Sequence, residues 1–186
     1  MIYSLPKALA VGGIEYEIRT DYRVILDAIA ALNDAELEPS ERAEACVRII
    51  FPDWRLIENH LEAYEQCMWF IACGDDSKPE RKPLKIMDWE QDFKLITPPV
   101  NRVLGYDCRG AEYLHWWTFV AAYYEIGECA FSCVTGIRRK LRAGKPLDKW
   151  EKEYYKDNRD IIELKLRMTA EEQAEIDDIL GGDENG

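Results

Sequence analysis

Two cysteines and one histidine are the candidate metal ligands in this chain of 186 residues. Cys129 and Cys133 lie four positions apart, so both thiols would share one face of a helix, and His115 could add a nitrogen ligand. A Cys/His metal-dependent enzyme is therefore one hypothesis. The same helical face also carries apolar residues: Ile126, Ala130 and Ile137. Small thiols fit such a face without a metal, and the chain has two histidines and no CxxC pair. We therefore expect no metal and no cofactor.

Motifs for other reactions are missing from the sequence. Gly12 and Gly13 are not followed by the lysine of a phosphate-binding loop, and neither GxSxG nor HExxH occurs. The 36 acidic residues offer many carboxylate pairs, but no spacing singles one out for acid–base catalysis. The sequence therefore predicts a protein that is not an enzyme.

A run of basic residues follows the two cysteines. Five of the positions from 138 to 145 are basic: Arg138, Arg139, Lys140, Arg142 and Lys145. Such a run could meet an acidic partner. Cations are also favoured at a helix C-terminus, because the free carbonyl groups there carry negative partial charge. We prefer this second interpretation.

The charge balance disfavours several classes of partner. With 24 basic and 36 acidic residues the formal net charge is −12, which repels nucleic-acid phosphates and anionic membranes. The start, MIYSLPK, shows no signal peptide. The longest uncharged apolar stretch, residues 113–124, is too short to span a bilayer. We therefore expect a cytoplasmic protein whose six cysteines are reduced thiols.

Length and composition predict one mainly α-helical domain of seven to eight helices that begins with a small β-hairpin. Its helical halves are expected over about residues 1–73 and 86–180. A charged, proline-containing linker, residues 74–85, joins them. The last residues, 181–186, are expected to form a flexible acidic tail.

The first half is expected to hold the hairpin and three helices. Residues 7–19 form two strands around Gly12-Gly13, which suits a tight turn with positive φ. Asp21 caps the first helix, a second follows Pro39-Ser40, and a third runs from about Trp54 to Cys73. The predicted apolar face of the first helix is Tyr22, Ile25, Leu26, Ile29 and Leu32, and that of the third is Leu56, Ile57, Leu61, Tyr64, Met68, Phe70 and Ile71.

The second half begins with a helix that Asp88 can cap. Pro98-Pro99 must break or kink this helix, because proline lacks the helical donor and clashes with the preceding turn. A later helix is expected over about residues 128–142. Asp148 and a capping-box pattern at Thr169 can start two more.

A helix over about residues 112–125 is expected to be the most buried one. Its polar residues Glu112, His115 and Thr118 line up at intervals of three, and nearly every other position is apolar. A helix that is apolar on most sides is buried, so His115 is interpreted as a structural, hydrogen-bonded histidine on a narrow polar stripe. The centre of the second half is expected to consist of Trp116, Trp117, Phe119 and Val120.

Four segments carry a further signal. They are the hairpin leading into TDYRVIL (20–26), DWEQDFKLI (88–96), LHWWTF (114–119) and IRR (137–139). Together they resemble a family of phage proteins encoded in the tail-gene region of long-tailed phages and prophages of Gram-positive bacteria, the bacteriophage "Gp fifteen" type. LHWW is the most specific element. The family-signature and core residues are Asp21, Leu114, His115, Trp116, Trp117, Phe119 and Arg138.

The resemblance implies a tail assembly protein. In its most specific form this is a chaperone that binds the phage tape-measure protein and keeps that long helical chain soluble in the host cytoplasm until the tail tube polymerises. Such a chaperone is expected to be absent from mature virions. A head–tail connector or tail subunit retained in the virion is the alternative. Neither the binding groove nor the oligomeric state follows from the sequence.

Overall fold

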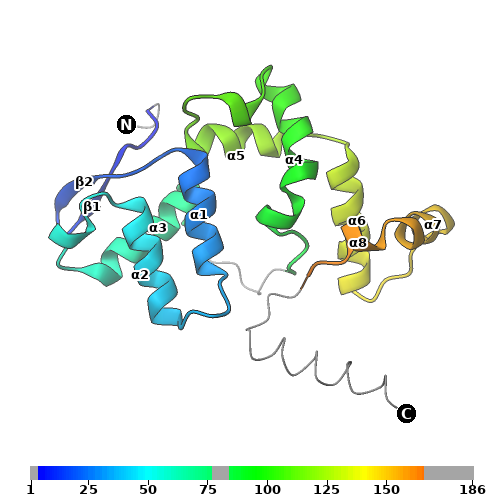
Figure 1. The fold of residues 1–186 in the computed structure, drawn as a ribbon, viewed down its shortest axis with the longest axis horizontal. Helices are drawn as coiled ribbons and strands as arrows, with labels where there is room; N and C mark the ends of the chain where they lie inside the picture. Colours follow the sequence, from blue (N-terminus) through cyan, green and yellow to red (C-terminus); the bar gives the residue numbers. More distant parts are fainter. Residues whose placement is uncertain (1–3, 77–83, 166–186) are drawn as a thin grey trace, which may run out of the picture.

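The computed structural model describes residues 4–76 and 84–165. Within these ranges the chain forms eight α-helices, two 3-10 helices and one two-stranded antiparallel sheet (Figure 1). The predicted fold class, mainly helical with an N-terminal hairpin, is confirmed. Most of the expected linker (77–83), the helix expected to start at Thr169 and the expected tail (181–186) lie outside the described residues.

The hairpin consists of β1 (Ala8–Val11) and β2 (Ile14–Glu17). Gly12 and Gly13 have φ values of 60° and 79°, which glycine adopts without the strain that a Cβ would bring. Leu9 pairs with Tyr16 and Val11 with Ile14, and directly paired residues share a face of the sheet. Leu9 and Val11 are buried on that face, whereas Ile14, at the tip, is 59% exposed.

Three helices follow the hairpin: α1 (Tyr22–Leu32), α2 (Pro39–Ile50) and α3 (His60–Ile71). The predicted third helix is wrong in its first part. Residues Trp54–Leu56 form a 3-10 helix, η1, and α3 starts only after Asn59, whose side chain accepts a hydrogen bond from the N–H of Glu62. Because residues 54–56 and α3 do not form one continuous helix, the apolar residues of the two segments do not share one face. Leu56 and Leu61 are 68% and 69% exposed, and the buried residues of α3 are Ala63, Cys67 and Phe70.

Helix α4 (Trp89–Leu104) runs through Pro98 and Pro99, so of the two expected outcomes, a break or a kink, the break is wrong. Two adjacent prolines remove two backbone donors, a cost that other parts of the helix offset. Asp88 caps its start by accepting from two backbone N–H groups, and Gly105 ends it in the left-handed conformation. Between the caps, Ile96, Thr97, Pro99 and Val100 are buried.

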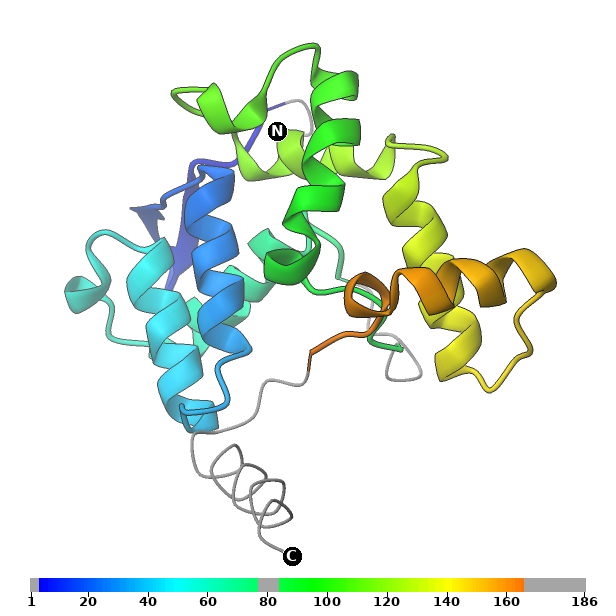
Figure 2. The same ribbon diagram turned by 45° about the vertical axis from the view of Figure 1, so that its right-hand side comes forward.

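The remaining elements are η2 (Cys108–Gly110), α5 (Trp116–Tyr124), α6 (Ala130–Arg142), α7 (Lys149–Asp157) and α8 (Arg159–Ile162). The helix predicted over residues 112–125 is wrong in its first turn, because α5 begins only at Trp116. In Figures 1 and 2 the hairpin and α1–α3 lie on one side, α6–α8 on the other, and α4 and α5 between them.

The aromatic residues of α5 pack between the two halves and do not form the centre of the second half. Trp116 and Phe119 are buried in a core that also contains residues of α1, α2 and α3. The indole N–H groups of Trp116 and Trp117 donate to the carbonyls of Ile71 and Phe70, at 3.0 and 2.9 Å. Trp117 is only partly buried, so its assignment to the core centre is corrected. A second cluster under α6 and α8 consists of Val134, Ile137 and Ile162.

Candidate functional site: an interhelical groove on a signature core

The TDYR and LHWW segments bind each other through their backbones. The N–H of Tyr22 donates to the carbonyl of Leu114 at 2.9 Å, and the N–H of Trp116 donates to the carbonyl of Thr20 at 2.7 Å. These bonds form an antiparallel bridge between Asp21 and His115. They also hold the residues before Trp116 out of the helix, which explains the late start of α5.

Asp21 strengthens this junction. Its carboxylate accepts from the N–H of Arg23 at 3.0 Å, capping α1, and from the N–H of Leu114 at 3.1 Å. The Arg23 guanidinium binds the same carboxylate. Burial alone would raise the pKa of Asp21, but these hydrogen bonds outweigh burial and lower it. The carboxylate therefore stays ionised as the link between α1 and α5.

His115 is a buried cap rather than a member of a polar helical stripe, so the predicted stripe is wrong. Its Nδ1 accepts from the N–H of Trp117 at 3.1 Å, and Nε2 lies 3.0 Å from the carbonyl oxygen of Pro6. The carbonyl accepts only, which places the proton on Nε2. Burial is the main cause that lowers the pKa of His115, so the ring is held in the neutral form.

The three metal-ligand candidates are not brought together. Cys129 is the N-cap residue of α6, and its backbone is extended rather than helical. The expectation that Cys129 and Cys133 share one face of a helix is therefore wrong. Both nitrogens of His115 have protein partners. In the part of the chain that the structure describes, no group of three His, Cys, Asp or Glu residues could hold a metal ion. The six cysteines are free thiols in the structure.

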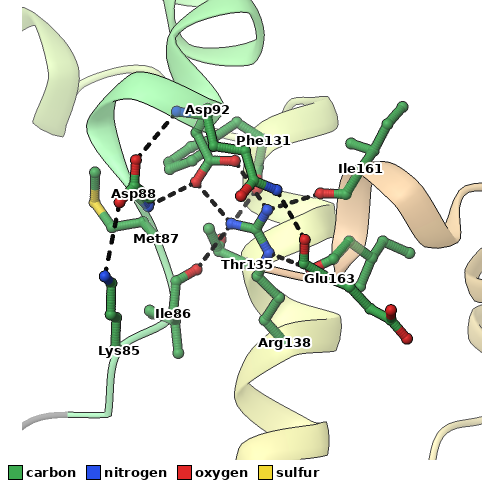
Figure 3. A network of polar contacts seen from close by, with 12 residues as sticks. Lys85, Ile86, Met87, Asp88, Asp92, Phe131, Thr135, Arg138, Ile161 and Glu163 are labelled. Atoms are coloured by element: carbon green, nitrogen blue, oxygen red, sulfur yellow. Dashed lines mark hydrogen bonds and ion pairs between the residues drawn. The ribbon is translucent and has the colours of Figure 1, made fainter. Parts of the chain in front are cut away.

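Arg138 lies inside the protein, so the interpretation that it balances the charge of a helix C-terminus is wrong for this residue. Its side chain is 3% exposed and forms a bidentate ion pair with Asp92 of α4, which is 1% exposed (Figure 3). The remaining N–H groups donate to three carbonyl oxygens, those of Ile86, Ile161 and Ile162. All five guanidinium N–H groups are thereby used. This network fixes the first turn of α4 against α6 and α8.

A groove of about 800 Å³ lies between α1 and the start of α4. Figure 2 shows these two helices next to each other. Its walls are mostly apolar, and its apolar and neutral lining residues are Tyr22, Leu26, Ile29, Ala30, Asn33, Met87, Trp89 and Phe93. Tyr22 is buried and Asn33 is exposed, and the other six residues are half-buried. Such half-buried apolar walls are typical of a binding groove.

The signature helix α5 positions both walls. The ring of Phe119 stacks on that of Tyr22 at a centroid distance of 4.5 Å. On the α4 side, Tyr123 lies 5.0 Å from the Trp89 ring, and its hydroxyl donates to the sulfur of Met87 at 3.2 Å. Helix α5 therefore contacts both walls of the groove without lining it.

Charged side chains of both signs surround the groove. Three are cations and three are anions: Arg23, Lys85, Arg109, Asp27, Asp88 and Glu90. Arg109 is paired with Asp107, and Lys85 lies 3.7 Å from Asp88. The rim is thus close to neutral in a strongly acidic protein. The groove is suited to a helix that has an apolar stripe flanked by charged residues of both signs.

Sequence reasoning placed Leu26 and Ile29 on the same face as the buried Tyr22 and Ile25, and so missed the groove. The groove could have been predicted from the width of the apolar face of α1, because that face is wider than one neighbouring helix can cover. The Asp92–Arg138 pair was missed as well. Its signal was a carboxylate one turn before the apolar Ile96, since a charge on a buried face needs a partner.

These features define a helical protein that presents an apolar interhelical groove above a tryptophan-rich junction. In residues 4–76 and 84–165, no helix has the length and apolar character needed to cross a membrane. The sequence model of the family described as "Bacteriophage Gp15 protein" matches residues 1–164. The chain therefore belongs to this bacteriophage family. No curated protein and no solved structure matches the chain.

Proposed function

We propose that the protein is a phage tail-assembly chaperone that binds an amphipathic helix of the tape-measure protein in the groove between α1 and α4. The groove is the observation that carries this proposal. A guest helix with apolar residues at i, i+3, i+4 and i+7 would cover its half-buried walls. Membership of the bacteriophage family supports a phage partner, and the family resemblance suggests which one.

The length of the groove suits a helical guest. On α1 the lining residues recur every three or four positions, from Tyr22 through Leu26 and Ile29 to Asn33. At 1.5 Å per residue this wall is about 16 Å long, which accommodates roughly three turns of a second helix. A few apolar anchors of the guest would therefore lie against Leu26, Ile29 and Phe93.

The charged residues of the protein are expected to affect solubility more than binding. Because cations and anions are equal in number at the rim, binding would rest on apolar contacts, and moderate salt would weaken it little. The net charge of −12 would keep the loaded complex soluble in the host cytoplasm. The proposed role requires no catalytic step and no cofactor.

Co-expression with the tape-measure protein tests the proposal. The wild-type chain should keep the tape measure in the soluble fraction and co-purify with it. Leu26→Glu/Ile29→Glu, which puts charges into the groove, should lose both effects while retaining the wild-type circular dichroism spectrum. Leu141→Glu, at an exposed leucine of α6 outside the groove, is the matched control and should behave like wild type. Equal solubility of the tape measure without this protein would refute the chaperone function.

The composition of finished particles separates the chaperone from the structural alternative. An assembly factor should be displaced when tube subunits surround the tape measure, so mass spectrometry of purified virions should not detect it. A fixed copy number in mature virions would instead establish a connector or tail subunit.

A further inference from the structure

Three segments that meet at the hairpin end of the protein each carry an exposed aliphatic side chain. Ile14 of β2 is 59% exposed, Leu56 of η1 is 68% exposed, and Leu61 in the first turn of α3 is 69% exposed. None of them lines the groove. Single exposed leucines are ordinary on protein surfaces, but several from different segments on one surface indicate an interaction site.

Two hydrogen bonds bring the three segments together. The N–H of Gly12 at the hairpin tip donates to the carboxylate of Glu62 at 2.9 Å, next to Leu61. The hydroxyl of Tyr16 in β2 donates to the carbonyl oxygen of Leu56 at 3.3 Å. Ile14 pairs with the buried Val11, so it lies on the hairpin face that packs on α3. We call the area bordered by Ile14, Leu56 and Leu61 the hairpin-end surface.

Acidic residues surround the hairpin-end surface. Glu58, Glu62 and Glu65 lie on either side of Leu61 in the sequence. Residues 56–72 contain no lysine or arginine. Two cations near this stretch, Arg48 and Arg55, stack over the ring of Trp54 at 4.4 and 4.9 Å. The surface therefore combines an apolar centre with a negative border.

Charge decides which partner fits. A second copy of the chain would set the same glutamates against one another, which costs free energy at an interface. A cationic partner would pair with them. Strand addition is disfavoured, because β2 is four residues long and carries two glutamates.

We propose that the hairpin-end surface binds a cationic amphipathic helix of a partner protein, with aliphatic anchors on Ile14, Leu56 and Leu61 and lysine or arginine beside them. This interaction is separate from the groove and does not depend on the chaperone function. The protein would thus hold two segments at once: an apolar helix in the groove and a basic helix at the hairpin end.

A panel of synthetic peptides tests this inference. Three helical peptides of about 18 residues share one leucine stripe and differ only in the flanking residues, which are lysine, glutamine or glutamate. The groove variant Leu26→Glu/Ile29→Glu serves as the starting protein, so that the peptides do not bind in the groove. In fluorescence anisotropy the lysine peptide should bind it, the glutamine peptide should bind about tenfold more weakly, and the glutamate peptide should not bind. High salt should weaken the lysine peptide, because the border charges are exposed.

Variants locate the binding. Added to the groove variant, Leu56→Ser/Leu61→Ser should weaken binding of the lysine peptide by about tenfold or more, whereas the matched control Leu141→Ser should leave it unchanged. Equal binding of the lysine and glutamine peptides would overturn the proposal, as would full binding to the Leu56→Ser/Leu61→Ser variant. Sedimentation velocity supplies the remaining check. A wild-type dimer that this double substitution dissociates would show that a second copy occupies the surface instead.

Discussion

Arg138 and Asp92 form a bidentate ion pair, with N–O distances of 2.7 and 2.9 Å, between side chains that are almost fully buried. Removing either partner leaves a charge in the interior without its counter-ion. Arg138→Met and Asp92→Asn should therefore each lower the free energy of unfolding by about 3–5 kcal/mol. Urea denaturation measures this change.

The double variant and an exposed pair provide the controls for this prediction. Arg138→Met/Asp92→Asn should cost less than the two single changes added together, because neither charge is then left alone. Glu44→Gln, which breaks the exposed pair with Arg48, should leave stability nearly unchanged. Losses below about 1 kcal/mol for both buried substitutions would mean that water reaches the network.

Trp116 and Trp117 are adjacent in sequence but differ in burial. Trp116 is 2% exposed, whereas Trp117 is only partly buried. Trp116→Ala should cost about 3–5 kcal/mol, as aromatic truncations in packed interiors do, and Trp117→Ala should cost less. Thermal and urea unfolding of the two variants, measured side by side, check the order. A larger loss for Trp117→Ala would contradict the described core.

His115 should make stability depend on pH. Burial lowers its pKa in the folded state below the ordinary value of 6.5, so the unfolded chain binds the proton more readily. The contribution of the neutral His115 ring to the free energy of unfolding is fully present above about pH 6.5 and is lost as the pH falls below that value. Protonation would also turn Nδ1 from the acceptor that caps α5 into a donor.

The free energy of unfolding should accordingly be lower at about pH 5.5 than at about pH 7.5. His115→Asn keeps a capping acceptor but cannot titrate, so it should flatten this dependence. His60→Asn, at an exposed histidine, should leave the pH dependence as in wild type. The same slope in wild type and His115→Asn would refute the assignment of this effect to His115.

Local sequence patterns predicted the elements whose signals are local. Gly12-Gly13 indicated the hairpin, and Asp21, Asp88 and Asp148 were identified as caps because an N-cap binds residues two or three positions ahead. The late start of α5 could not be predicted in this way. It depends on bonds from Leu114 and Trp116 to residues near position 21, 93 positions away in the case of Asp21.

The candidate site could not be predicted from local sequence patterns either, because it depends on residues that are distant in the sequence. Periodicity shows that Leu26 and Ile29 belong to an apolar face, but it does not show whether a neighbouring helix covers them. Likewise, Arg138 stands in a run of basic residues, and only the approach of Asp92 from 46 positions away shows that it is buried. Two of the three faults in helix assignment, those at Trp54 and at Pro98-Pro99, arose where two start or stop signals competed.

The cysteines provide a further prediction. Cys46, Cys67 and Cys108 are 0% exposed, and burial raises the pKa of Cys73 to about 11. Since the thiolate is the reactive form, thiol reagents should label the native protein slowly. In denaturant, all six thiols should react, and purified protein should contain no stoichiometric zinc. Fewer reactive thiols, or one metal ion per chain, would contradict the reduced, metal-free state.

Direct titration of the groove tests the central proposal. Isothermal calorimetry would compare wild type, Leu26→Glu/Ile29→Glu and Leu141→Glu, each titrated with a purified amphipathic segment of the tape-measure protein. Wild type and Leu141→Glu should bind with equal affinity, of the order of micromolar, and the groove variant should bind at least about tenfold more weakly. Undiminished binding by a folded groove variant, or no binding by wild type, would contradict the proposal that this groove holds the tape measure.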